Sequence, residues 1–261
     1  MQSSHRKLSR DKLSISVLLV LVAWLTWRPA VAGQELIVSA AASLTNAFKE
    51  IGAAFEKNHS DLKVILNFAA SGPLLQQIER EAPVDVFTSA DQETMNRGQV
   101  KGLISATSRR DFTANRLVLV ASSLPPVVIK SLDDLTNPTV KRIAVGKPET
   151  VPAGRYAQQA LEIQKLGELL TPKFIYADSV RQVLDYVSRG EVEAGFVYLT
   201  DAVIAKDKVK LVAELATEEP ITYPIAIVAA SKQPQLAADF VNFVLSPDGQ
   251  AILANYGFRK P

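Results

Sequence analysis

The sequence predicts an α/β protein built from two lobes with a cleft between them. Short β-branched, apolar runs alternate with segments of helical periodicity, which is typical of βαβ units. The 229 residues that follow an apolar N-terminal segment are enough for one large or two small α/β domains. No short repeat or low-complexity tract interrupts the alternation. These three observations together favour a fold of mixed, mostly parallel sheets flanked by helices.

The individual elements follow from the spacing of the apolar residues. Strands are expected at residues 35–39, 63–68, 84–88, 117–121, 142–145, 174–176, 194–198, 209–212 and 225–229. Helices are expected at residues 44–58, 73–81, 91–101, 153–161, 180–189 and 235–246. In the segment 180–189, Val180, Val183, Leu184 and Val187 recur at i, i+3, i+4 and i+7, so this face is expected to lie in the core.

The two ends of the chain are expected to share one lobe. After residue 224 only one strand and one helix remain, which is too little for a third domain. We therefore expect residues 33–115 and 225–261 to form lobe I and residues 116–224 to form lobe II. The chain would cross between the lobes near residues 115–116 and 223–224. Two such crossings are typical of a hinge that closes around a ligand.

Residues 1–32 have the pattern of a cleaved signal peptide. Basic residues precede an apolar run from Leu13 to Trp27, and Ala30-Val-Ala32 fits the small-residue rule for signal peptidase. A membrane anchor is the competing interpretation, but the run is shorter than the roughly twenty residues that span a bilayer. We expect export and a mature chain that starts near Gly33.

The net charge and the cysteine and histidine content exclude or disfavour several classes of function. Residues 1–32 hold five Lys or Arg and one Asp, whereas the whole chain has a net charge of +2, so the remainder carries about −2. This charge does not favour a nucleic-acid partner. The absence of cysteine excludes disulfides and a lipid-modified cysteine, so an exported protein of this kind is expected to be an untethered resident of the periplasm. We also expect it to be a monomer. Only His59 remains after residue 32, which leaves little material for histidine metal sites or Ser-His-Asp catalysis.

Small and hydroxylic residues recur where a predicted strand passes into a predicted helix. Three such turns contain Ser43, Ser71 and Ala153-Gly154, and a fourth contains Ser179 before Val180. Tyr198 ends another strand, at the edge of the sheet where α/β proteins bind ligands. Each serine has an ordinary interpretation as a helix N-cap, and Tyr198 as a half-buried aromatic residue. Together, helix N-termini, hydroxyls and a phenol predict a site rich in hydrogen-bond donors, which suits a fully deprotonated oxyanion.

Four segments and the ending carry a resemblance to a known family. They are Ser39-Ala-Ala-Ala-Ser-Leu-Thr-Asn-Ala-Phe48, Pro83-Val-Asp-Val-Phe-Thr-Ser-Ala-Asp91, Val145-Gly-Lys-Pro-Glu-Thr-Val-Pro-Ala-Gly154, Gly195-Phe-Val-Tyr-Leu-Thr-Asp-Ala202 and Tyr256-Gly-Phe258. In order and spacing the chain resembles the periplasmic molybdate-binding proteins of ABC importers. The resemblance implies a two-lobed, type II periplasmic-binding-protein fold without enzyme activity or cofactor. It also implies that a molybdate or tungstate dianion is held in the cleft and delivered to an inner-membrane ABC permease.

The resemblance also implies which residues bind the oxyanion, and thereby its molybdenum. By motif, the hydroxyl donors fall on Ser43, Ser71 and Tyr198, and the backbone donors on Ala153 and Val180. The chain departs from the commonest pattern at Gly72-Pro73, where many relatives have Ser-Thr, and at Lys147, where an acid is common. Neither departure falls on an implied donor.

Other functions remain open as alternatives. A receptor for sulfate, phosphate or another small anion would use the same donors. An exported serine hydrolase is disfavoured because the sequence lacks a G-x-S-x-G elbow and His59 lies in a polar Asn-His-Ser stretch. The sensory domain of a transcription factor is disfavoured by the export signal and by the lack of a helix-turn-helix pattern.

Overall fold

The computed structural model describes residues 34–124 and 127–261, and residues 35–261 form one compact unit. The predicted signal peptide, residues 1–32, lies outside the described residues. Within the described ranges, every helix is too short or too polar to span a bilayer.

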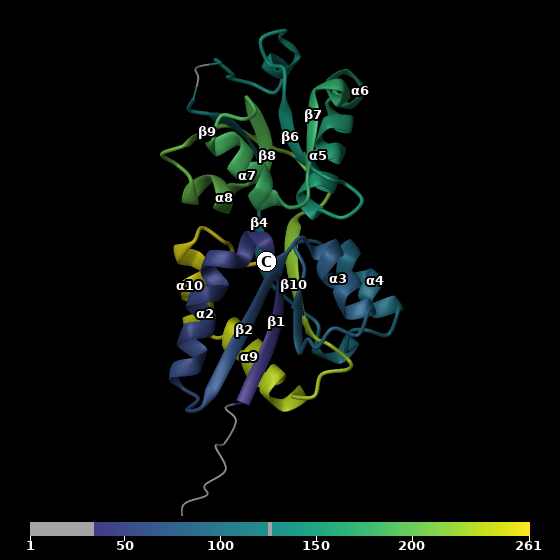
Figure 1. Cartoon of the computed structure of the whole chain (residues 1–261), viewed down its shortest axis with the longest axis vertical. Coiled ribbons are helices and arrows are strands. Elements are labelled where there is room, and N and C mark those ends of the chain that lie inside the picture. Colours follow the sequence, from purple (N-terminus) through teal and green to yellow (C-terminus); the bar gives the residue numbers. More distant parts are fainter. Residues whose placement is uncertain (1–33, 125–126) are drawn as a thin grey trace, which may run out of the picture. The chain divides into compact units, whose positions relative to one another are not determined.

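Ten strands of the described residues form two sheets, shown in Figure 1. The strands are β1 (Gln34–Ala41), β2 (Leu62–Ala69), β3 (Val86–Thr88), β4 (Arg110–Asn115), β5 (Leu117–Ser122), β6 (Ile143–Gly146), β7 (Phe174–Ala177), β8 (Ala194–Tyr198), β9 (Val209–Leu215) and β10 (Ile221–Ile227). Sheet I has the order β2-β1-β3-β10-β4 and sheet II the order β7-β6-β8-β5-β9. Both sheets are mixed, because β10 runs antiparallel to β3 and β4, and β5 runs antiparallel to β8 and β9. The predicted α/β fold class with mixed sheets is confirmed, but the sheets are not mostly parallel, because β5 and β10 each form two antiparallel ladders.

The helices flank these sheets. The α-helices are α2 (Thr45–Lys57), α3 (Ser71–Glu79), α4 (Gln92–Val100), α5 (Pro152–Ile163), α6 (Gly167–Leu170), α7 (Val180–Ser188), α8 (Leu199–Ile204), α9 (Pro234–Leu245) and α10 (Pro247–Asn255). The 3-10 helices are η1 (Ala42–Leu44), η2 (Ala106–Ser108), η3 (Asp133–Thr136) and η4 (Thr171–Lys173).

Two separate apolar clusters hold the helices against sheet I. On one side, α2 and α9 bury aromatic rings, and Phe55 meets Phe240 edge to face with ring centroids 5.2 Å apart. On the other side, α3 and α4 bury Leu74 and Met95 in a second cluster. In Figure 1 the two groups of helices lie on opposite sides of the strands. Because burial of each such side chain contributes about 1.5–3 kcal/mol, these clusters fix the helices that lead into the site.

In sheet II, α7 packs against β6 and β8 through its apolar face. Val180, Val183, Leu184 and Val187 are all buried, as the periodicity predicts. The start of α7 is thereby held at the end of the sheet where β8 places Tyr198.

The chain passes from sheet I to sheet II at Arg116 and returns through residues 216–220. The returning strand begins at Ile221, four residues before the expected start of the returning segment at residue 225. Proline lacks the N–H that a strand donates to its ladder, so its position within a strand needs an irregularity. In the structure Pro224 lies inside β10, at a register shift that accommodates the missing N–H. The expected crossing at residues 223–224 is therefore corrected to residues 216–220.

Sequence analysis did not predict strand β4 or the helices α6, α8 and α10. Strand β4 lacks an alternating apolar pattern because it is an edge strand that pairs within the sheet only with β10. The helices α6 and α8 are each shorter than two turns and give no periodicity. Helix α10 had a readable signal, since Ser246 caps it by accepting from the N–H of Gly249 and Pro247 stands in its first turn.

Candidate functional site

A small cavity, partly open to solvent, lies where elements of sheet I meet elements of sheet II. Its lining residues are small, apolar or hydroxylic: Ala41, Ala42, Ser43, Ala70, Ser71, Ala90, Val151, Pro152, Ala153, Val180 and Tyr198. All five residues that the sequence pointed to are among them. The cavity therefore collects donors from η1, α3, α5, α7 and the end of β8.

Ser43 does not cap a helix, which corrects the sequence interpretation. It lies in the middle of η1, whose N-cap position is Ala41. Its side chain instead shares a 3.0 Å hydrogen bond with the hydroxyl of Tyr223, a residue 180 positions away. Ser43 is nearly fully buried and is one of the residues that line the cavity.

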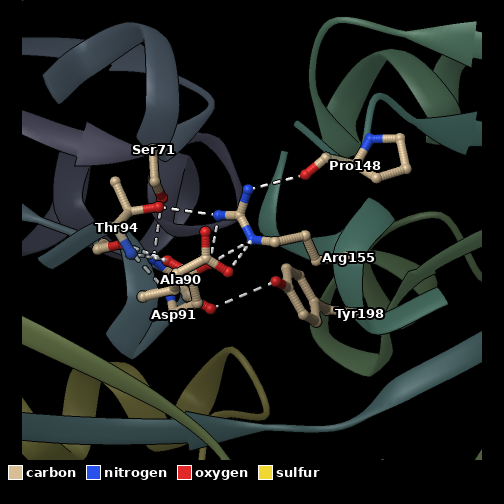
Figure 2. A network of polar contacts seen from close by, with 9 residues as sticks. Ser71, Ala90, Asp91, Thr94, Pro148, Arg155 and Tyr198 are labelled. Atoms are coloured by element: carbon tan, nitrogen blue, oxygen red, sulfur yellow. Dashed lines mark hydrogen bonds and ion pairs between the residues drawn. The ribbon is translucent and has the colours of Figure 1, made fainter. Parts of the chain in front are cut away.

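Ser71 is also not a cap. It is the first residue of α3, preceded by Ala70 in the N-cap position, and Pro73 is the third residue rather than the first. The Ser71 Oγ accepts a hydrogen bond of 3.0 Å from the backbone N–H of Ala90 (Figure 2). Because an oxygen lone pair accepts this bond, the hydroxyl hydrogen of Ser71 stays available to donate to a ligand in the cavity.

The two expected backbone donors lie in first turns of helices. Ala153 is the second residue of α5 and Val180 the first of α7, and such N–H groups have no acceptor within their own helix. The Ser179 side chain caps α7 by accepting from the N–H of Gln182 at 3.2 Å, so this predicted cap is confirmed. A Cβ on Gly154 would lie 2.0 Å from the carbonyl oxygen of Gly146, so glycine is needed for α5 to begin this close to β6.

Gly72, which departs from the commonest family pattern, touches the opposite side of the cavity. Its N–H donates to the carbonyl oxygen of Thr150 at 3.1 Å, and an added Cβ would lie 2.6 Å from that oxygen. Glycine at this position lets the start of α3 approach the loop before α5 directly.

Tyr198 is fully buried at the end of β8. Its hydroxyl donates to the carbonyl oxygen of Ala90 over a long 3.4 Å (Figure 2). Burial raises the pKa of the phenol well above its ordinary value of 10, so Tyr198 stays protonated and acts as a donor.

Two arginines near the cavity were missed by sequence analysis, and both are compensated. Arg155 of α5 forms an ion pair with Asp91, the N-cap of α4, and donates to the Thr94 hydroxyl at 2.8 Å (Figure 2). Arg181 donates to the Ser43 carbonyl oxygen at 3.2 Å and forms a 2.6 Å ion contact with the buried Asp201. Each arginine thus contacts a residue on the opposite side of the cavity, and neither arginine lines the cavity itself.

Two further charges lie away from the donors. Lys147 pairs with Asp178 at 2.5 Å, and both side chains are largely exposed. The positive potential that Lys147 would bring to the site is therefore neutralised locally. Among the described residues, no group of three or more His, Asp or Glu could hold a metal ion.

His59 has a structural role at the far end of α2. Its Nδ1 lies 2.9 Å from the carbonyl oxygen of Phe55, and its ring stacks on the Phe55 ring with centroids 4.1 Å apart. Since α2 has thirteen residues, it separates His59 from Ser43 by about 20 Å. Among the described residues, Ser43 therefore has no histidine within reach to act as a base.

The comparisons with known proteins agree with this geometry. A family described as bacterial extracellular solute-binding protein matches residues 36–259. The molybdate-binding protein ModA of Escherichia coli K12 is 40% identical over 232 residues, which cover 86% of this chain and 88% of that protein. ModA of Haemophilus influenzae is 32% identical and covers 87% of this chain and 91% of its own. The solved structure of the periplasmic molybdate-binding protein of Azotobacter vinelandii has a TM-score of 0.76 at 25% identity, and covers 87% and 99% of the two chains.

The chain thus combines two mixed sheets, a cavity lined by residues from the elements of both, and a match to one family over residues 36–259. The chain belongs to the bacterial extracellular solute-binding proteins and has the type II periplasmic-binding-protein fold.

Proposed function

We propose that this protein captures molybdate as a dianion in the cavity lined by Ser43, Ser71, Ala153, Val180 and Tyr198. The observation that carries the proposal is that three hydroxylic residues and two residues in first helical turns line one small cavity. Tungstate, which has nearly the same size and the same charge, is proposed to bind to the same donors. Relatives at up to 40% identity bear the name molybdate-binding protein, which supports the choice of ligand.

Neutral donors suit this ligand for a physical reason. Buried, preorganised dipoles replace the hydration shell of a dianion, whereas an unpaired arginine in the cavity would add its own desolvation cost. The N-termini of α5 and α7 add partial positive charge at the points where their N–H groups face the ligand. The two nearby arginines keep their charges in ion pairs with Asp91 and Asp201.

Two properties of an anion are expected to determine selectivity: its size, and whether it carries a proton. Sulfate has the same charge and shape but shorter bonds, so it would leave donors unfilled at a cost of about 1–3 kcal/mol each. Phosphate near neutral pH carries a proton, which finds no acceptor among donor groups. We therefore expect the order molybdate and tungstate, then sulfate, then phosphate.

Capture is proposed to involve closure of two lobes. The residues 33–115 with the C-terminal segment from Ile221 onward would form lobe I, and residues 117–215 the body of lobe II, with Arg116 and residues 216–220 as hinges. Bonds that join the two sides, such as Gly72 to Thr150 and Tyr198 to Ala90, would form on closing. On binding, the Tyr198 hydroxyl would turn from its long bond with Ala90 to the oxyanion.

The wider role is part of the same proposal. We propose a monomer exported by a cleaved signal peptide at residues 1–32, resident in the periplasm, without enzyme activity or cofactor. It would deliver the oxyanion to the membrane permease of an ABC importer.

A titration of the protein lacking residues 1–32 tests the proposal. Isothermal calorimetry with molybdate, tungstate, sulfate and phosphate should give tight one-to-one binding of the first two only. A thermal-shift panel gives an independent measure, since a bound ligand stabilises the folded state by mass action. Tighter binding of sulfate than of molybdate would assign the protein to sulfate instead, and no binding of any of the four anions would overturn the proposal.

A further inference from the structure

Tyr223 contacts two residues of the candidate site, Ser43 and Tyr198, without itself lining the cavity. It is fully buried in β10, beside the hinge at residues 216–220, and its ring packs edge to face on Tyr198 and Phe258 with centroids 5.7 and 5.8 Å away. Its hydroxyl has two partners among the described residues: the Ser43 Oγ at 3.0 Å and the Asn115 Nδ2 at 3.3 Å.

The direction of these hydrogen bonds can be worked out from Asn115. The Asn115 Oδ1 accepts from the backbone N–H of Arg116 at 2.9 Å, which places its Nδ2 on the other side. There the amide donates both to the Thr200 hydroxyl, at 2.9 Å, and to the Tyr223 hydroxyl. An amide nitrogen only donates, so Tyr223 accepts from Asn115.

The Tyr223 hydrogen must then go to Ser43. Of the two partners of the Tyr223 hydroxyl, only the Ser43 oxygen can accept, and a buried hydroxyl hydrogen without an acceptor is costly. Burial raises the pKa of Tyr223 well above 10, so this hydrogen is present at any working pH. Ser43 accepts from Tyr223 and keeps its own hydrogen for the cavity.

We infer that Asn115 and Tyr223 form a hydrogen-bond relay that forces Ser43 to act as a donor toward the bound anion, and that Tyr223 thereby determines selectivity against protonated oxyanions. The inference rests on the proposed function, because it concerns how the same site rejects ligands that carry a proton. Ser71 is oriented separately, by the backbone N–H of Ala90, and no side-chain substitution removes that donor. Tyr223 is a positioning residue, since it acts through Ser43.

The experiment measures dissociation constants for molybdate and phosphate by calorimetry at one pH. In Tyr223→Phe the ring contacts remain, but the Ser43 hydroxyl can rotate and accept a proton from phosphate. We expect molybdate to bind about tenfold more weakly. We also expect the ratio of molybdate to phosphate affinity to fall at least tenfold. Tyr256→Phe is the matched control, because that hydroxyl bonds the exposed Glu50 and lies outside the cavity lining; both affinities should stay within twofold of wild type.

A double-mutant cycle separates the relay from a general structural effect. If Tyr223 acts through Ser43, the variant with both Ser43→Ala and Tyr223→Phe should bind molybdate within twofold of Ser43→Ala alone. The effects of Ser71→Ala and Tyr223→Phe should multiply. Equal weakening of molybdate and phosphate by Tyr223→Phe, or multiplicative effects with Ser43→Ala, would overturn the relay.

A second variant and the wild-type titration allow the relay to be tested even if Tyr223→Phe does not fold. Asn115→Ala removes the other end of the relay and should lower the ratio of molybdate to phosphate affinity about threefold, so it replaces Tyr223→Phe if that variant does not fold. The wild-type titration is scored first: absence of molybdate binding there would overturn both the proposed function and the relay. Molybdate binding by wild type with an unchanged affinity ratio in the variants would overturn the relay alone.

Discussion

The ion pair between Arg155 and Asp91 is predicted to hold the two sides of the candidate site together. Arg155 extends from α5, on the side of sheet II, to the N-cap residue of α4, on the side of sheet I (Figure 2). Both side chains are largely buried, with 13% and 5% of their surfaces exposed, so solvent screens the pair little. If the lobes open, this pair must break. Replacing Arg155 by alanine should therefore disfavour the closed state.

The loss of stability of the closed state depends on the hydrogen bonds that Asp91 retains when Arg155 is removed. Removing one partner of a buried pair costs about 3–5 kcal/mol, because the other charge stays buried. Asp91 still accepts hydrogen bonds from the Ser89 hydroxyl and the Thr94 N–H, at 3.0 and 3.1 Å, which offsets part of this cost. We take a loss of about 2–3 kcal/mol for the closed state, which weakens molybdate binding about 30- to 150-fold if closure is required for binding.

Calorimetric titration of Arg155→Ala with molybdate measures this loss, and small-angle X-ray scattering checks whether molybdate still compacts the protein. Arg142→Ala is the matched control, because Arg142 pairs with Glu193 within the side of sheet II and is about half exposed. An exposed pair contributes about 0–1 kcal/mol, so the control should bind within about fivefold of wild type. A dissociation constant of Arg155→Ala within threefold of wild type would refute the reasoning.

Three further predictions concern single positions. Ser43→Ala and Tyr198→Phe should each weaken molybdate binding by about 10- to 150-fold, Ser43→Ala more so, because each removes a hydrogen bond to a charged ligand; unchanged calorimetric affinity in both would remove these residues from the site. Burial raises the pKa of Asp201 from 3.8 to about 6, so its stabilising contribution is fully present below pH 4 and is lost as the pH rises to 6. Relative to Asp201→Asn, the free energy of unfolding of wild type should fall by about 3 kcal/mol across that window in urea titrations, and parallel curves would contradict the shifted pKa. Gly72→Ala should weaken molybdate binding at least tenfold, since its Cβ would lie 2.6 Å from the Thr150 carbonyl oxygen; wild-type affinity in calorimetry would show that this approach is not needed.

The elements with strong local patterns were predicted well from the sequence. Strand β8 has the predicted bounds, and α7 ends one residue before the predicted end, because a continuous apolar run and an apolar helical face are local properties. The edge strand β4 and the short helix α8 were missed. Helix α8 is capped by Asp201, which accepts from the N–H of Tyr198 at 3.2 Å, and a tyrosine in the N-cap position is not a recognisable signal in a sequence.

For the candidate site too, the residues were predictable from local patterns, whereas their hydrogen-bond partners were not. Its five residues were identifiable because they follow strand ends and open helices, and such positions are marked by small and hydroxylic residues. The interpretation of Ser43 and Ser71 as caps was wrong, since their oxygens bond Tyr223 and the Ala90 N–H instead. A serine before a helix has the same local pattern whether it caps that helix or meets a distant group.

By itself, then, the sequence determined the α/β class, most of the elements and five of the eleven residues that line the cavity. The tertiary structure decided which way the hydroxyl of Ser43 donates and which charges join the two sides of the cavity. The reason is distance along the chain: Tyr223 lies 180 residues from Ser43, and Arg155 lies 64 residues from Asp91. Periodicity and capping report contacts within one or two turns, whereas hydrogen-bond partners from different sheets are chosen only when the whole chain has folded.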